Sequence, residues 1–111
     1  MSFRLAARIK TVPFDQNTIG SFALVEGKGL RTFRVTAYEL KAVGANTITW
    51  KSGTSAVTPA TPIDAGERIA LAGDGESPLF SCKPNEDLVI TLGAATRVVG
   101  WVSYTAETSS I

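Results

Sequence analysis

The chain has 111 residues, a formal net charge of +1, 44% hydrophobic residues and 19% charged residues. This composition is that of one globular domain with a buried core, and it excludes a disordered chain. The near-neutral charge argues against a protein devoted to nucleic acid. No apolar run approaches the roughly 20 residues of a membrane helix, so we expect no membrane partner.

The N-terminal residues and the single cysteine both point to folding in a cytoplasm. Met1 to Arg8 contain no apolar segment of the kind found in secretion signals. Cys82 cannot form an internal disulfide, so the core must hold the fold together. We expect Cys82 to be a small buried hydrophobe, because it follows a strand-like run and no histidine exists to activate a thiol.

The first segment, residues 2–11, alternates between apolar and basic side chains. A period of two predicts a strand with a basic outer face, or an arm that becomes a strand only against a partner. Pro13 is expected to break this pattern, because it has no N–H for a ladder. The residues expected to contact a partner are Phe3, Leu5 and Ile9 on one side, and Arg4, Arg8 and Lys10 on the other.

Further strand-like runs follow, separated by turn signals. The longest, Leu30–Lys41, would place Phe33, Val35 and Ala37 on one face and Tyr38 near the other, so that Leu40 needs a bulge or a twist to rejoin the core. We expect this run to form a hairpin with the next strand. The remaining shorter candidates are Ile19–Val25, Thr47–Lys51, Glu67–Leu71 and Leu79–Cys82.

The C-terminal part is organised around the strand candidate Arg97–Tyr104. With the run Glu86–Leu92 and a four-residue connection it predicts a hairpin over residues 87–105. Both faces of this strand carry apolar bulk, with Val102 on one and Trp101 on the other. Cover on both faces requires a second sheet or a neighbouring subunit.

About eight short strands spaced by roughly ten residues predict an all-β fold, a single antiparallel β-sandwich of jelly-roll type. We divide the chain into an N-terminal arm or first strands (1–29), a sandwich core (30–105) and a flexible tail (106–111).

The residue types argue against an enzyme. Without histidine the chain lacks the usual general base, and no serine lies in a nucleophile motif, so we expect no catalytic residue, no cofactor and no small-molecule substrate. A hydrolase would require Asp74 and Glu86 to converge in a cleft. The turn carboxylates are interpreted as solvated turn residues and not as a metal site; they are Asp64, Glu67, Asp74, Glu76, Glu86 and Asp87.

Aromatic and basic residues leave two weaker possibilities. Phe3 and Phe33 beside basic residues form a pattern typical of single-stranded nucleic-acid binding, which the net charge disfavours. The basic residues are Arg4, Arg8, Lys10, Arg31 and Arg34. A sugar-stacking platform is the second possibility, but burial is expected because each aromatic lies inside an alternating strand. The residues concerned are Trp50, Trp101, Tyr38 and Tyr104.

Six segments in order resemble small virion-associated proteins of tailed bacteriophages. In that family a strand ending in Tyr precedes a Thr-x-Trp/Phe-Lys-Ser-Gly turn, a small-residue crossing, a loop leading to an aromatic, a Glu-x-Leu strand and a closing Gly-x-x-x-Tyr strand. The resemblance covers roughly residues 30–105. The matching segments are Leu30–Tyr38, Thr49–Thr54, Thr61–Ile63, Ser77–Phe80, Glu86–Leu92 and Val99–Tyr104.

The resemblance implies a capsid decoration or cement protein, commonly a homotrimer, on the capsid surface of a virion assembled in the host cytoplasm. Its partner would be the major capsid protein, and it would bridge neighbouring capsomers. The alternative is a carbohydrate-binding β-sandwich module of a phage host-recognition or tail structure. Exposed aromatics in a groove would favour the alternative.

Overall fold

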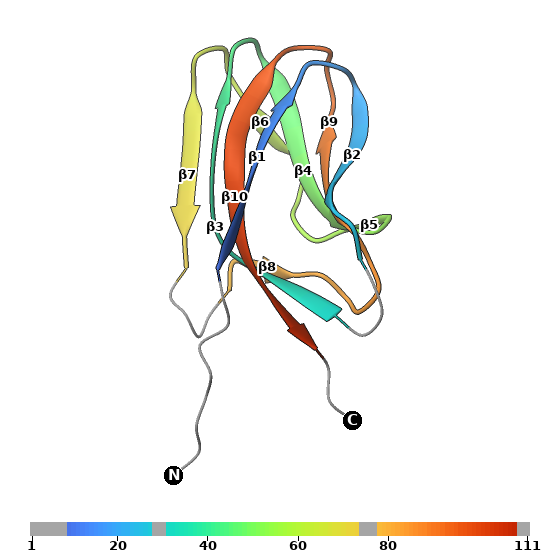
Figure 1. Ribbon diagram of the computed structural model, residues 1–111. Helices are drawn as coiled ribbons and strands as arrows, with labels where there is room; N and C mark the ends of the chain where they lie inside the picture. The colour runs from blue at the N-terminus through green and yellow to red at the C-terminus, as the bar shows by residue number, and fades with distance from the viewer. Residues whose placement is uncertain (1–8, 28–30, 74–77, 109–111) are drawn as a thin grey trace.

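The computed structural model describes residues 9–27, 31–73 and 78–108, and these form two antiparallel sheets packed face to face (Figure 1). The all-β sandwich expected from the sequence is confirmed. Sheet A has the order β1 (Lys10–Gln16), β10 (Val98–Thr108), β3 (Arg31–Ala42) and β7 (Arg68–Ala72), with β8 (Phe80–Ser81) also paired to β3. Sheet B has the order β2 (Gly20–Val25), β9 (Leu88–Leu92), β4 (Asn46–Ser52) and β5 (Ser55–Ala56), with β6 (Thr61–Ile63) also paired to β4.

Successive long strands lie in opposite sheets, which gives the jelly-roll connectivity. The chain crosses between sheets from β1 to β2, from β3 to β4 and from β9 to β10. The two predicted hairpins, 87–105 and 30–51, are therefore wrong: β10 pairs with β1 and β3, and β9 pairs with β2 and β4. A short connection between alternating strands fits an arch between sheets as well as a turn within one.

The core lies between the sheets and contains an aromatic cluster centred on Trp50, which is only 1% exposed. The Trp50 ring centroid lies 6.1 Å from that of Phe14, 5.0 Å from Tyr38 and 5.6 Å from Phe80. Phe33 and Tyr104, from the adjacent strands β3 and β10, make an edge-to-face contact at 5.4 Å. Rings from both sheets thus fix how the sheets pack.

A β-bulge in β3 changes which residues face this core. Ser103 is paired with Ala37 and Tyr104 with Val35, so Thr36 is an extra residue. The Thr36 carbonyl accepts a hydrogen bond from the Gly73 N–H at 2.7 Å. The expected bulge is confirmed, but it lies before Ala37, so Tyr38 faces the core and Ala37 faces outward.

Two segments continue the sheet where the sequence predicted interruption. β1 runs through Pro13, which is paired with Trp101. This is feasible because β1 is an edge strand and Pro13 need donate no hydrogen bond on its open side. β10 continues to Thr108, paired with Arg31, so the expected tail at 106–111 begins inside a strand.

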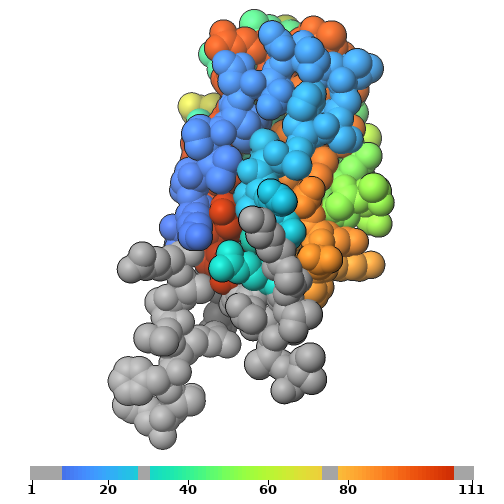
Figure 2. Space-filling model, turned by 45° about the vertical axis from the view of Figure 1, so that its right-hand side comes forward, coloured from blue at the N-terminus to red at the C-terminus, as the bar shows by residue number. Residues whose placement is uncertain are grey.

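β1 and β2 lie along one side of the sandwich (Figure 2).

At the end where β3 joins β4, the buried Asn46 links the β3–β4 connection to the β9–β10 connection through hydrogen bonds. Its Nδ2 donates to the carbonyls of Ala94 and Thr96 at 3.0 and 3.1 Å, and its Oδ1 accepts from the N–H of Ala94 at 3.0 Å. This end of the molecule is held by a satisfied polar network.

Candidate interaction surface

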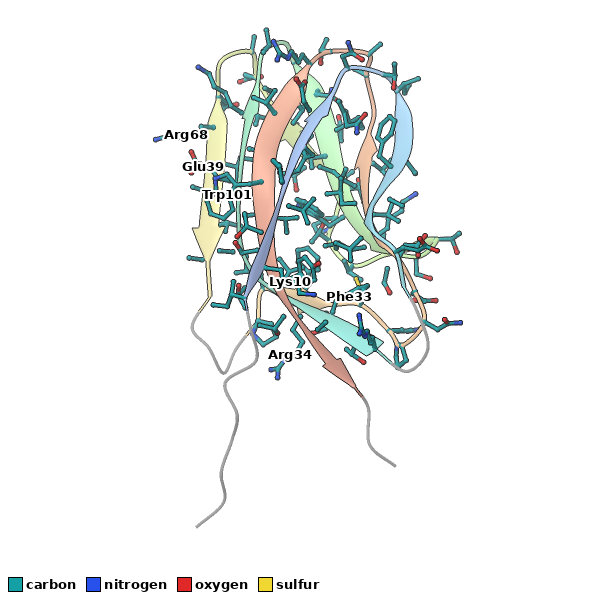
Figure 3. All side chains as sticks on the ribbon, viewed as in Figure 1. Lys10, Phe33, Arg34, Glu39, Arg68 and Trp101 are labelled. Atoms are coloured by element: carbon teal, nitrogen blue, oxygen red, sulfur yellow. The ribbon has the colours of Figure 1, made fainter. Side chains whose placement is uncertain are left out.

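The outer face of sheet A carries Trp101 and has no cover from the described part of the chain. Gly100 and Val102 face the core, so Trp101 points away from it. Its cross-strand neighbours are Pro13 on β1 and Glu39 on β3, and Ala70 on β7 is paired with Glu39. Trp101 and the Glu39–Arg68 pair lie on the same side of the molecule (Figure 3).

An open depression lies beside the indole of Trp101. It has a volume of about 470 Å³ and is lined by Thr11, Pro13, Trp101 and Ser103. The hydroxyls of Thr11 and Ser103 are hydrogen-bonded to each other at 2.8 Å. We call these four residues the Trp101 depression.

Two ion pairs flank the depression on the same face. Arg97 binds Asp15 through two hydrogen bonds, Nε to Oδ1 at 3.0 Å and Nη2 to Oδ2 at 2.7 Å. The hydrogen bond from Arg97 lowers the pKa of Asp15, and the same bond raises the pKa of Arg97. Arg68 lies 3.2 Å from Glu39 on the other side. Both ion pairs are largely exposed to solvent, so they contribute little to the free energy of unfolding. Their main effect is on the distribution of charge around the depression.

The structure describes two of the six predicted partner-binding residues, Ile9 and Lys10. Phe3, Arg4, Leu5 and Arg8 lie outside the described residues. Ile9 is 65% exposed immediately before β1, and Lys10 is exposed at its first position, opposite Tyr104. Of the six predicted residues, the two that the structure describes, Ile9 and Lys10, lie at the start of the edge strand β1.

The same end of sheet A has an open strand edge. β1 pairs with β10 only as far as Tyr104, whereas β10 continues to Thr108 against β3. Within the described ranges, Thr105–Thr108 has no ladder partner on the β1 side. An unpaired edge presents N–H and C=O groups to which another strand can add.

The described turn carboxylates act as hydrogen-bond acceptors for nearby groups. Glu67 Oε1 accepts from the Asp64 N–H at 2.6 Å, and Asp87 Oδ1 accepts from the Gly27 N–H at 2.7 Å. Asp74 and Glu76 lie outside the described residues. Among the residues that are described, no group of three or more His, Cys, Asp or Glu side chains could hold a metal ion.

Cys82 is a buried residue and a poor nucleophile. It is 1% exposed, and burial raises the pKa of its thiol to about 11. The neighbouring Ser52, also 1% exposed, fixes the chain next to Cys82: its hydroxyl accepts from the Lys83 N–H at 2.9 Å and donates to Glu86 Oε1 at 2.6 Å. The thiol therefore stays protonated at neutral pH, as the sequence interpretation required.

The aromatic residues divide between the core and the surface. Trp50, Tyr38 and Tyr104 pack inside, and Phe33 is 2% exposed and so cannot stack on nucleic-acid bases. Trp101 differs from these residues because it lies on the outer face of sheet A, where its side chain is partly buried. Alternation placed Trp101 on the same face as Val99 and Ser103 but did not show that this face points outward. Thr11 and Pro13 come from a strand about 90 residues earlier and could not be assigned to this face from sequence.

No helix in the described residues is long and apolar enough to cross a membrane. No family model matches the chain, and the curated proteins give no significant match. Among solved structures, the chain is similar to a subunit of Bacillus endospore appendages, described as a novel family of disulfide-linked pili. The two are 17% identical, with a TM-score of 0.53 over 99% of this chain and 98% of the other. At this identity the likeness defines a shared sandwich fold.

Proposed function

We propose that the protein is a non-catalytic structural subunit of a larger protein assembly. Its specific form is a capsid decoration or cement protein of a tailed bacteriophage, bound to the major capsid protein and bridging neighbouring capsomers. The resemblance of residues 30–105 to virion-associated proteins supports the specific form. The fold shared with an appendage subunit is compatible with the broader one.

The observation that carries the proposal is the open edge of β10 beside the start of β1. Among the described residues Thr105–Thr108 has no partner on the β1 side, and Ile9, which follows the alternating apolar and basic segment in the sequence, lies at the same end. Strand addition supplies main-chain hydrogen bonds, and flanking side chains supply specificity. A subunit of this kind needs only a complementary surface and no active site.

Covalent linkage through Cys82 plays no part in this proposal. The single thiol is buried and protonated, so it cannot form a disulfide with a neighbour while the sandwich is folded. In this respect the chain differs from the disulfide-linked pili whose fold it shares. In this proposal attachment comes from non-covalent contacts.

The attachment is tested by deleting residues 1–8, which leaves β1 intact. We expect the truncated protein to keep its thermal unfolding midpoint and to lose co-sedimentation with shells assembled from the major capsid protein of the same genome. A double variant, Phe3→Ser with Leu5→Ser, removes the apolar side, and Arg4→Ser with Arg8→Ser removes the basic side. Normal co-sedimentation of the truncated protein would refute the role given to this segment.

The proposed assembly state is a homotrimer. Light scattering of the purified protein at micromolar concentration should give a mass three times that of the 11.7 kDa chain. Contacts around a three-fold axis would let one decoration unit hold several capsomers. A monomeric mass at all concentrations would contradict the trimer.

A further inference from the structure

We propose that the Trp101 depression is a binding site for a neutral carbohydrate, with a sugar ring stacked on the indole. This inference rests on the outer face of sheet A and is independent of the proposed structural role. Trp101 is the one member of the four Trp and Tyr residues that points away from the core in the described chain. An aromatic ring on a sheet face offers the C–H face of a pyranose an apolar surface.

The size and lining of the depression fit such a ligand. The depression is shallow and open, with a volume of about 470 Å³, so it would contact one face of a sugar ring and would not enclose it. Trp101 and Pro13 supply the apolar surface, and the hydroxyls of Thr11 and Ser103 supply polar groups. Sites of this kind combine a mainly apolar lining with a few polar groups that orient the ligand.

The hydroxyl pair keeps spare hydrogen-bonding capacity. The 2.8 Å bond between Thr11 and Ser103 uses one donor and one acceptor, which leaves the pair one O–H donor and further acceptor positions. Thr11 is exposed, so its hydroxyl can reach a ligand, whereas Ser103 is 8% exposed and mainly orients Thr11. A polyol, which both donates and accepts, matches this pair.

The charges on this face favour a neutral ligand. Asp15 is paired with Arg97, and Glu39 is paired with Arg68, so each carboxylate flanking the depression already has its counter-ion. A phosphate or a strongly charged peptide would have to compete with these pairs. A neutral sugar would leave them in place and contact Trp101 between them.

The test uses the two tryptophans as site and internal control. In a ¹⁵N–¹H spectrum of the full chain, the indole N–H of Trp101 reports the depression, and that of Trp50, 1% exposed, reports the core. The probes are linear trisaccharides of glucose, galactose and N-acetylglucosamine at millimolar concentration. We expect at least one trisaccharide to shift the Trp101 signal in a saturable way and to leave the Trp50 signal unchanged.

Matched variants separate stacking from other effects. Trp101→Ala should weaken binding about tenfold, and Trp101→Tyr should restore part of it because an aromatic surface returns. Thr11→Val should weaken binding less. Val99→Ala, the preceding outward residue of β10 and no part of the depression, should leave binding unchanged.

Two outcomes would overturn the proposal. One is that none of the three trisaccharides shifts the Trp101 signal. The other is that the Trp101 signal depends on protein concentration and that Trp101→Ala lowers the mass measured by light scattering, because a second copy of the chain would then cover this face. A failure of capsid attachment leaves the Trp101 result unaffected, so the two proposals can fail separately.

Discussion

Replacing Trp50 with alanine should lower the free energy of unfolding by about 3 to 5 kcal/mol, as for other large core aromatics. Trp50 is 1% exposed and contacts rings from β1, β3 and β8, so its removal leaves a cavity that three elements would have to fill together. Urea unfolding followed by far-UV circular dichroism measures the change without depending on tryptophan fluorescence.

Two further variants control this experiment. Trp101→Ala removes the same side chain from the outer face and should cost clearly less than Trp50→Ala, because Trp101 is only partly buried. Trp50→Phe should cost clearly less than Trp50→Ala, because a phenyl ring fills most of the space that alanine would leave empty beside Tyr38 and Phe80. Equal destabilisation by Trp50→Ala and Trp101→Ala would show that the core is not centred on Trp50.

Replacing Gly100 with alanine should lower the free energy of unfolding towards the upper end of about 1 to 3 kcal/mol. A Cβ at this position would overlap the carbonyl oxygen of Glu39 and lie 2.8 Å from Cα of Leu40. These are backbone atoms of the adjacent central strand, so no side-chain movement can relieve the contact. Gly100 is therefore required by the close approach of β10 and β3.

Gly93→Ala is the matched control for this prediction. Its Cβ would lie 3.1 Å from Cβ of Thr47, a tight contact but much longer than the overlap with the Glu39 carbonyl oxygen at Gly100. We expect the unfolding free energy to change by less than about 1 kcal/mol, since the loss of backbone freedom in the unfolded chain offsets part of the crowding. Comparable losses for the two variants in chemical denaturation would contradict the role given to Gly100.

The positions of most strands could be predicted from sequence because alternation and turn residues are local signals. Which sheet each strand joins could not be predicted in the same way. The connection at residues 93–97 leads from sheet B to sheet A, yet its glycine and small residues are equally typical of a turn within one sheet. Pairing depends on contacts between segments far apart in the chain, which alternation does not encode.

The side-chain directions show the same limit. Inserting Thr36 reverses the alternation of β3, and one residue of shift was enough to assign Tyr38 to the wrong face. For the candidate surface, alternation placed Trp101 opposite Gly100 and Val102, but burial was expected for it, and the depression required Thr11 and Pro13 from β1. Pro13 was expected to end a strand, and only the edge position of β1 allows it to lie beside Trp101.

The burial of Cys82 has a consequence for any assembly that this subunit enters. With the single thiol enclosed and its pKa raised to about 11, contact with a neighbour stays reversible in oxidising and reducing surroundings alike. The lifetime of such a contact is then set by its dissociation rate, which depends on buried area and strand pairing. A particle built this way could exchange its subunits with free protein in solution without any change in redox conditions.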